Sequence, residues 1–389
     1  LNDSNTSRRD FLKYVGFSTA AAAAAACEGP VIKSVPYVVQ PEQIRPGIAN
    51  YYATTIADGF DYGSILIKTR EGRPIKVENN NETPVLGDAN ARVHASVLSM
   101  YDTQRLQGPK GNGAEISWED LHLQVGAKLN ALAATNKEVV LLTQTFASPT
   151  TAKLIADFTA KYPNVKHVSF DTVASSDAVD AFEEAYGVRA LADYDFSKAE
   201  AIVSIGADFL GDWQGGGFDS GYSKTRVPSK DHGKAKMSKH FQFEANMTLS
   251  GAAADHRVPA TPSAQKNILA HLYGAITGTA VSGSLSQAHQ AKVDAAVAAL
   301  KAAGSKAVVV SGIQDKGAQA LVLAINNALG SEVMDANSPR LIRQENGGEV
   351  KPVIDAVIAG TLGGLITVGI NPVFSLPEGE AFAEGMKKL

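Results

Sequence analysis

The chain has 389 residues, of which 44% are hydrophobic and 20% are charged, and its formal net charge is −4 at pH 7. These values are ordinary for a globular protein long enough to hold more than one packed module. The slightly acidic balance gives no support to nucleic-acid binding, which calls for a basic stripe. The single cysteine, Cys27, excludes internal disulfides, cysteine-ligated iron–sulfur clusters and structural zinc–cysteine sites.

The N-terminal segment carries the features of an export signal. Arg8 and Arg9 stand in the phrase SRRDFLK, and an uncharged run over residues 14–26 follows them. This is a twin-arginine address, and its apolar run is too short to span a bilayer. Alanines directly before Cys27 are typical of a bacterial lipoprotein box. We therefore predict a signal and lipid-anchor segment over residues 1–27; the alternative is an alanine-rich helix with a chance cysteine.

Repeated prolines bar regular structure in the next stretch, so residues 28–50 are predicted to form an extended tether. Residues 51–135 are predicted to form a small β-rich module. Two alternating runs about a Glu-Gly turn, residues 65–69 and 74–78, predict a β-hairpin within it. A helix is expected to close the module, with Ser117 as its N-cap.

Residues 136–389 alternate between short apolar runs and helical segments. The predicted strands are EVVLLTQ, VKHVSF, AEAIVSIGAD, KHFQFEAN, KAVVVSGIQ and GGLITVGINP. This alternation predicts an α/β fold, Rossmann-like, with a largely parallel sheet covered on both faces. Residues 211–239 show no periodicity and predict a long loop, either functional or a solvated insertion. The last residues, AFAEGMKKL, come where the alternation calls for another strand, so we expect the chain to continue beyond residue 389.

Two predicted strands end in the same way. Gly206 and Asp208 follow one of them, and Gly369 and Asn371 follow the other. Ligands of open parallel sheets bind beyond the carboxyl ends of the strands, so these four residues are candidate nucleotide-like half-sites. The alternative is that glycine ends a buried strand for steric reasons. Neither G-x-G-x-x-G nor a P-loop motif is present, which argues against NAD and against P-loop nucleotide binding.

Other candidates for chemistry are weaker. Asp255, His256 and Arg257 are adjacent and could bind an anion or relay a proton, or form a hydrogen-bonded turn. The remaining histidines lack the spacing of metal ligands, and no G-x-S-x-G motif marks a serine nucleophile. We therefore predict no catalytic residue and no metal ligand.

The phrase YDTQRLQGP, which begins at Tyr101, and the phrase ISWED, which begins at Ile116, resemble the N-terminal region of molybdopterin oxidoreductases. Relatives that bind a cluster carry cysteines before the hairpin and before the Tyr-Asp phrase, where this chain has YYATTIADGFDYG and ARVHAS. A cysteine ligand to molybdenum is thereby excluded, whereas a serine or aspartate ligand is not. Asp208 also replaces the asparagine of the usual Gly-x-Asn-Pro pattern, so the half-sites are expected to be vestigial.

Together with the twin arginines and the stretch PYVVQPEQIRPGIANYYATT, these features resemble the iron–sulfur subunit family of bacterial alternative complex III. The resemblance implies a cofactor-free, non-catalytic scaffold in a quinol-oxidising membrane complex on the periplasmic side of the inner membrane. It implies that 3Fe–4S and 4Fe–4S clusters lie in an absent C-terminal half. It also implies as partners multihaem and monohaem cytochrome c subunits and polysulfide-reductase-like membrane subunits.

Two other functions stay open at this point. One is an exported molybdenum–pterin oxidoreductase with a non-cysteine metal ligand. The other is a solute-binding lipoprotein, because such proteins are also exported α/β proteins with a lipoprotein box.

Overall fold

A computed structural model describes residues 12, 13, 15, 39, 41–58, 61–83, 89–227 and 237–389. The chain divides into two compact units, residues 1–48 and 49–389, and all the elements below belong to the second. Arg8, Arg9 and Cys27, the predicted signal and anchor residues, lie outside the described residues.

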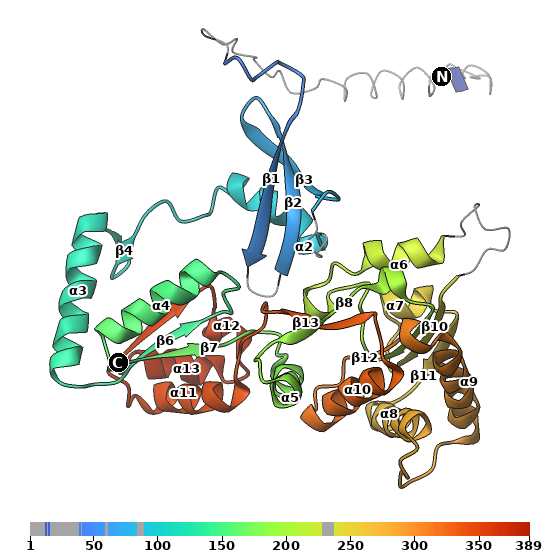
Figure 1. Cartoon of the computed structure of the whole chain (residues 1–389). Coiled ribbons are helices and arrows are strands. Elements are labelled where there is room, and N and C mark those ends of the chain that lie inside the picture. The colour runs from blue at the N-terminus through green and yellow to red at the C-terminus, as the bar shows by residue number, and fades with distance from the viewer. Residues whose placement is uncertain are drawn as a thin grey trace, which may run out of the picture. The chain divides into compact units, whose positions relative to one another are not determined.

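The N-terminal sheet is an antiparallel meander (Figure 1) of β1 (Asn50–Asp58), β2 (Asp61–Arg70) and β3 (Arg73–Asn79). The predicted β2–β3 hairpin is confirmed. Strand β1 was not predicted, because its side chains are almost all exposed and show no buried face. Its strand conformation depends on pairing with β2 along its whole length. The small core of this module consists of Ile65, Val77, Ala89 and Val93.

A short helical and extended segment follows the meander. Its elements are α2 (Ala91–Ala95), η1 (Ser96–Tyr101), β4 (Lys110–Gly111), β5 (Ala114–Glu115) and α3 (Trp118–Ala134). The predicted cap of α3 is confirmed, since the Ser117 hydroxyl accepts a hydrogen bond from the Asp120 backbone N–H at 3.0 Å.

The first parallel sheet has the strand order β14–β6–β7. Its strands are β6 (Val139–Thr143), β7 (Val165–Ser169) and β14 (Gly364–Val368). The surrounding helices are α4 (Pro149–Lys161), α11 (Gly347–Ala359), α12 (Pro372–Ser375) and α13 (Gly379–Met386). In Figure 1, α4 lies on one face of this sheet, and α11 and α13 lie on the other. Each face has its own apolar core.

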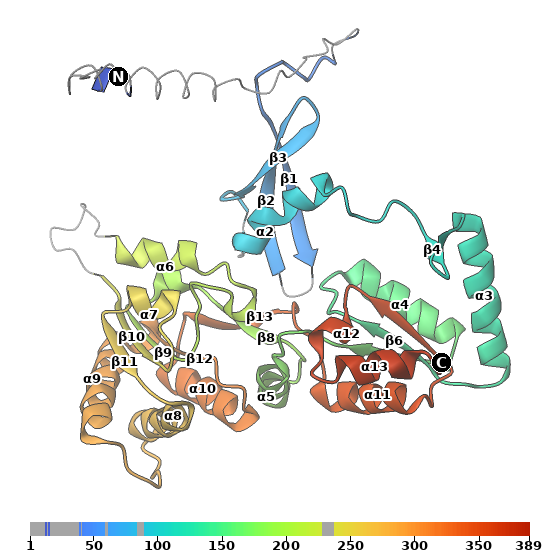
Figure 2. The ribbon, with the colours of Figure 1, turned by 180° about the vertical axis from the view of Figure 1, so that it is seen from behind.

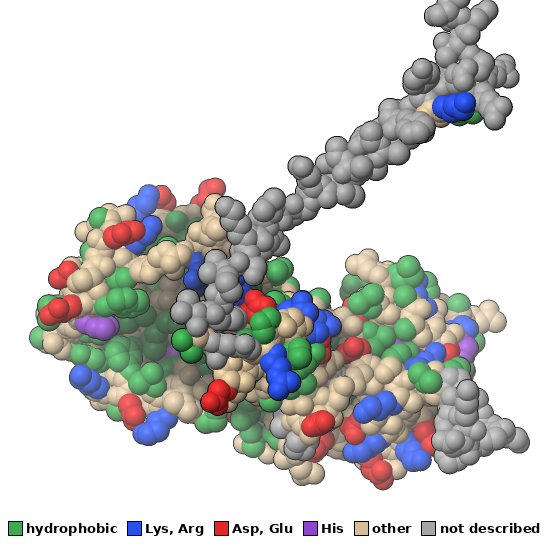
Figure 3. Space-filling model, turned by 90° about the horizontal axis from the view of Figure 1, so that it is seen from above, with side chains coloured by type: hydrophobic (Ala, Val, Ile, Leu, Met, Phe, Trp, Pro, Cys, Tyr) green, Lys and Arg blue, Asp and Glu red, His purple; other side chains and the backbone are tan. Residues whose placement is uncertain are grey.

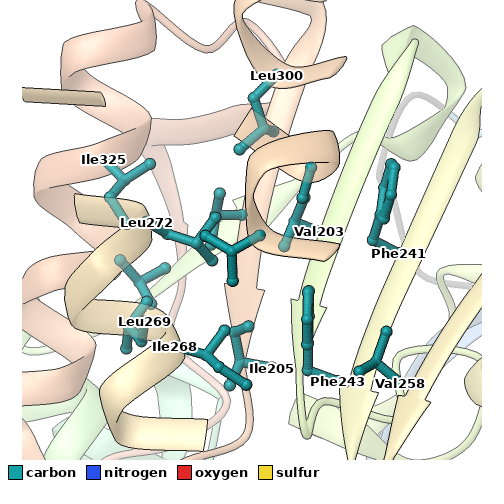
Figure 4. Packing of buried hydrophobic residues seen from close by; sticks show 14 of the residues in the cluster. Val203, Ile205, Phe241, Phe243, Val258, Ile268, Leu269, Leu272, Leu300 and Ile325 are labelled. Carbon is teal, nitrogen blue, oxygen red and sulfur yellow. The ribbon is translucent and has the colours of Figure 1, made fainter. Parts of the chain in front are cut away.

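The second parallel sheet has the order β11–β10–β9–β12. Its strands are β9 (Ala201–Ile205), β10 (Lys239–Glu244), β11 (His256–Pro259) and β12 (Ala307–Ser311). Its helices are α7 (Leu249–Ala253), α8 (Pro262–Thr277), α9 (Gln287–Ala303) and α10 (Lys316–Leu329). Figure 4 shows Val203, Ile205 and Phe243 of the strands packed against helix residues such as Ile268 and Leu272. This packing holds α8, α9 and α10 against one face of the sheet.

An antiparallel pair lies between the two parallel sheets (Figures 1 and 2). It consists of β8 (Leu191–Tyr194) and β13 (Met334–Arg340). Helix α5 (Ser176–Tyr186) precedes β8, η2 (Phe196–Lys198) follows it, and η5 (Gly304–Lys306) directly precedes β12. The α/β class and the largely parallel pairing are confirmed. The parallel strands nevertheless fall into two sheets, because the apolar runs do not encode which strands are neighbours.

The expectation of a long loop over residues 211–239 is wrong in part. The structure places η3 (Trp213–Gly215) and α6 (Asp219–Arg226) there, while residues 228–236 are not described. Tertiary contacts stabilise α6: Tyr222 is buried, and Arg226 donates to Asp255 at 2.7 Å. Such contacts come from distant segments and leave no periodicity in the local sequence.

Charged side chains of both signs are interspersed on the face seen from above in Figure 3, with hydrophobic side chains exposed between them. This mixture agrees with the small net charge. Within the described ranges, no helix combines the length and the apolar character that a membrane span needs.

Candidate functional site at the carboxyl ends of the strands

The two predicted half-sites share a backbone feature. Gly206 directly follows β9 with φ +68°, and Gly369 directly follows β14 with φ +70°. This left-handed region favours glycine, which accounts for the shared sequence pattern. The two glycines end strands of different sheets, so the structure does not bring the half-sites together on one sheet edge.

The chain's own residues cover the Gly206 end. A Cβ atom placed on Gly206 would lie 2.7 Å from the Gln265 side-chain oxygen, Oε1. Gln265, near the start of α8, is held there because its Nε2 donates to the Ala260 carbonyl at 3.0 Å. An amide from α8 therefore occupies the space beside Gly206.

Asp208 serves as a structural acceptor. Its Oδ1 accepts hydrogen bonds from the Ser250 backbone N–H at 2.9 Å and from the Ser250 hydroxyl at 2.8 Å. The same hydroxyl accepts from the Leu210 N–H at 3.0 Å. These bonds fasten the loop after β9 to the first turn of α7.

The second half-site is covered in the same manner. A Cβ atom on Gly369 would come within 2.6–2.9 Å of the Gln144 side-chain amide. Gln144 follows β6, and its Nε2 donates to Asp58 Oδ1 at 2.8 Å. Asn371 caps α12, because its Oδ1 accepts from the Phe374 N–H at 3.3 Å. All four predicted half-site residues thus contact other residues of the chain. Their role in ligand binding stays a prediction.

A row of polar side chains on β10 was not predicted. His240, Gln242 and Glu244 project from one face of the strand and are fully buried, while Phe241 and Phe243 fill the core on the other face. The His240 Nε2 lies 3.2 Å from Gln242 Oε1, and the Gln242 Nε2 donates to Glu244 at 3.2 Å. The signal was present in the alternation H-F-Q-F-E, which is typical of a strand with two different faces.

Burial sets the charge of His240. Desolvation lowers the pKa of its imidazole to about 4, so the ring is neutral at pH 7. Burial raises the pKa of Glu244, but hydrogen bonds from Thr248 and Arg257 outweigh that effect and lower the pKa overall. Arg257 Nε donates to Glu244 Oε1 at 2.6 Å. The row is therefore a satisfied internal network with one compensated charge pair.

The side chains of the adjacent residues Asp255, His256 and Arg257 contact different partners. Asp255 accepts from both terminal nitrogens of Arg226, at 2.7 and 2.8 Å, and from the His240 backbone N–H. Arg257 pairs with Glu244, and the exposed ring of His256 packs on Phe241 with centroids 4.6 Å apart. The three side chains do not converge on one point. Asp255 lies in the bend directly before β11, whereas His256 and Arg257 are the first two residues of that strand, so the expected turn involves Asp255 alone of the three.

Two of the cavities in the described structure are lined by charged side chains that pair with one another or with their neighbours. One, of about 410 Å³, has Asp193 and Arg340 in its wall, with Oδ1 and Nε 3.7 Å apart. The other, of about 380 Å³, lies at the carboxyl end of β7 and is lined in part by His167, Arg189 and Glu349. Neither is lined by any of the four predicted half-site residues. The lining residues come from distant parts of the chain, so no local motif marks them.

The second cavity carries no surplus positive charge. Burial lowers the pKa of His167, and its Nε2 lies 2.9 Å from the Thr143 hydroxyl. Arg189 donates to Asp180 at 2.6 Å and to Glu183 at 2.9 Å. The cavity is therefore polar without being an evident anion site. In the part of the chain that the structure describes, no group of three or more His, Cys, Asp or Glu side chains is placed to hold a metal ion.

No family model matches the chain. Two curated proteins show weak sequence similarity to it: one is a molybdopterin-containing subunit and the other a molybdopterin-binding-like subunit of a reductase. The chain is 25% identical, over 69% of its length, to the arsenate respiratory reductase molybdopterin-containing subunit ArrA of Shewanella. It is 24% identical, over 98% of its length, to the menaquinone reductase molybdopterin-binding-like subunit of Nitratidesulfovibrio vulgaris. The chain spans 32% of the first relative and 62% of the second.

Among solved structures, acetylene hydratase from Pelobacter acetylenicus matches 70% of this chain and 43% of its own length, with a TM-score of 0.47 and 10% identity. The chain therefore shows weak sequence similarity to molybdopterin-binding and molybdopterin-binding-like subunits of reductases.

The arrangement of the strand ends bears on the cofactor that this class implies. Gln265 and Gln144 place their side-chain amides beside Gly206 and Gly369. Both amides end flexible side chains, so a dinucleotide that reached either glycine would have to displace them. The absence of a cofactor from these residues stays a prediction.

Proposed function

We propose that these residues form the non-catalytic scaffold half of the iron–sulfur subunit of a membrane quinol oxidoreductase of the alternative complex III type. The observation that carries the proposal is the covering of both glycine strand ends by the chain's own amides, Gln265 and Gln144. The single cysteine supports it, because cysteine-ligated clusters would have to lie elsewhere. The similarity to a molybdopterin-binding-like subunit over 98% of the chain supports it too.

In this role the scaffold positions a cluster-bearing half for electron transfer from quinol to cytochrome c or to an oxidase. The 3Fe–4S and 4Fe–4S clusters would be held by polypeptide outside residues 1–389. We propose as partners multihaem and monohaem cytochrome c subunits and polysulfide-reductase-like membrane subunits. The location would be the periplasmic side of the inner membrane, with a lipid anchor on Cys27.

The test uses the complete protein, purified from the membranes of its host. Molybdenum, pterin and iron are measured per polypeptide, and haem c is measured in the same fraction. We expect iron and co-purifying cytochromes, with molybdenum and pterin far below one per polypeptide. Stoichiometric molybdenum together with pterin would overturn the proposal.

The second candidate is an exported molybdenum–pterin oxidoreductase with a non-cysteine ligand. The similarity to a molybdopterin-containing arsenate reductase subunit favours it. It predicts the opposite outcome of the same measurement. A solute-binding lipoprotein, the third possibility, predicts a monomer that purifies without cytochromes.

A further inference from the structure

A polar cavity lies where four separate segments of the chain meet. Its volume is about 410 Å³, which is large enough for a small organic molecule. Its wall comes from the segment after β3, from the end of β8 and the start of η2, from the start of α6, and from the last residue of β13. Neither the four half-site residues nor the polar row on β10 lines it. The cavity is therefore a separate place in the fold.

The carboxylates in the wall of this cavity have cationic neighbours. The Arg340 Nε lies 3.7 Å from the Asp193 Oδ1, and both side chains are largely buried. Asp195 accepts a hydrogen bond from the Ser197 hydroxyl at 2.6 Å, and its Oδ2 lies 3.3 Å from the Lys198 Nζ. The charges of the two carboxylates are therefore already compensated.

This compensation selects against a charged ligand. An ammonium group that approached Asp193 would also meet the Arg340 guanidinium, and a carboxylate that approached Arg340 would also meet Asp193. Moving either ion out of water without a counter-charge of its own is unfavourable. Burial raises the pKa of Asp193 in spite of Arg340, so this carboxylate is already poorly solvated. The remaining charged residue of the wall, Lys224, is exposed and keeps its hydration.

The uncharged polar residues of the wall match hydroxyl groups. Asn80 and Asn81 supply amides, and Ser197 and Ser220 supply hydroxyls, all of which can donate and accept hydrogen bonds. A ligand hydroxyl has the same two capacities, so it can donate to a carboxylate such as that of Asp193 while it accepts from an amide. Several hydroxyls on one small molecule would satisfy these groups without adding charge.

Aromatic residues complete the wall. Tyr194, Phe196 and Phe218 line the cavity together with the polar groups. The Arg340 Cζ lies 4.9 Å from the centre of the Phe218 ring, and this stacking orients the guanidinium. Ligand pockets typically combine aromatic surface with a few placed polar groups. A molecule that carries both hydroxyls and an apolar C–H face fits such a wall.

We propose that this cavity binds a small neutral polyol of the size of a monosaccharide. Its hydroxyls would donate to Asp193 and accept from Arg340, and they would exchange hydrogen bonds with the Asn80 and Asn81 amides. Its C–H groups would lie against the aromatic residues. The inference goes beyond the proposed function and does not depend on it, because no redox centre takes part.

The test compares sugars of one ring size and different charge on the complete protein. The neutral probes are glucose, galactose and mannose; glucuronate is the anionic probe and glucosamine the cationic one. Titrations followed by saturation-transfer NMR measure binding. We expect at least one neutral hexose to bind with a dissociation constant in the millimolar range, as suits a ligand of this size. Both charged sugars should bind about 10-fold more weakly.

Two variants locate the binding in this cavity. Asn81 is exposed, so Asn81→Ala should leave the fold intact and weaken binding of the neutral hexose by about 3-fold or more. Asp193→Asn removes the neighbour of the Arg340 charge, so it should weaken the neutral hexose and bring the affinity for glucuronate level with it or above it. The control Asp157→Asn removes an exposed carboxylate of α4 and should change neither affinity.

Three results would overturn the proposal. One is the failure of all three neutral hexoses to bind at concentrations well above the millimolar range. Another is binding of a charged sugar to the wild-type protein as tight as that of the neutral ones. The third is unchanged hexose binding in Asn81→Ala and Asp193→Asn, which would place the sugar outside this cavity; if Asp193→Asn does not fold, Asn81→Ala decides alone.

Discussion

Arg257 and Glu244 lie on neighbouring parallel strands, and the Arg257 Nε donates to the Glu244 Oε1 at 2.6 Å. The carboxylate is buried, while the guanidinium keeps partial contact with solvent. This pair brings a charged partner to the polar row of β10.

Removing the arginine alone should be costly. Arg257→Met leaves the buried Glu244 carboxylate without its cation, so we expect the free energy of unfolding to fall by about 2–3 kcal/mol, below the range for a fully buried pair. Urea unfolding of the purified protein measures this loss. The double variant Glu244→Gln/Arg257→Met should recover most of it, since glutamine keeps a partner for Thr248. A loss in the single variant no larger than in the double variant would contradict this account.

The buried histidine predicts a pH dependence of stability. Burial lowers the pKa of His240 from 6.5 to about 4, so between these values the unfolded chain binds a proton that the folded chain does not. Stability is therefore fully present above pH 6.5 and is lost as the pH falls toward 4, by about 3 kcal/mol from this group. Unfolding at a series of pH values should show the loss.

The control for this prediction is His240→Gln, which has no titrating ring and can still reach Gln242. The difference in unfolding free energy between the two proteins isolates the contribution of His240 from those of carboxylates that titrate in the same range. A difference that does not change between pH 7 and pH 4.5 would refute the assignment.

The covering of Gly206 can be tested by a double-mutant cycle. Gly206→Ala forces a left-handed conformation on alanine, at a cost of about 1–2 kcal/mol, and brings its Cβ against Gln265. In a Gln265→Ala background the collision is removed and the backbone cost remains. We expect a coupling energy of about 0.5–1 kcal/mol, measured by urea unfolding. Strict additivity of the two changes would show that Gln265 does not lie over Gly206.

The predicted lipid anchor is tested at Cys27. Cys27→Ser should abolish the acyl mass on the N-terminal peptide of the membrane-bound protein, as read by mass spectrometry. Because one acyl chain binds membranes only marginally, release into the soluble fraction should be partial while partner subunits are present. The control Arg8→Lys/Arg9→Lys should instead leave the protein in the cytoplasm. Finding Cys27 without an acyl group in the wild-type protein would contradict the predicted lipid anchor.

Much of the fold followed from local patterns. The hairpin of β2 and β3 and the Ser117 cap of α3 depend on contacts within a few residues, and the structure has both. Strand β1 and helix α6 were missed because each is held by partners far along the chain, such as Asp255 for Arg226.

In the candidate site, too, local features could be predicted from the sequence and long-range contacts could not. The left-handed glycines after β9 and β14 could be recognised because a backbone requirement leaves its mark on a single residue. Gln265 and Gln144, which cover them, carry no mark of that role, since a glutamine in a helix or after a strand is compatible with many positions. Likewise, the polar row on β10 alternates visibly in sequence, but its burial depends on α7 and the segment after β9 packing over it.

By itself the sequence determined the α/β class, the shortage of sulfur ligands and the two glycine strand ends, because composition and short-range backbone requirements are properties of neighbouring residues. Only the tertiary structure decided that the parallel strands form two sheets and that amides from distant elements lie against both glycine strand ends. Those features arise from which segments pack together, and the free energy of packing is spread over many weak contacts that no single stretch of sequence contains.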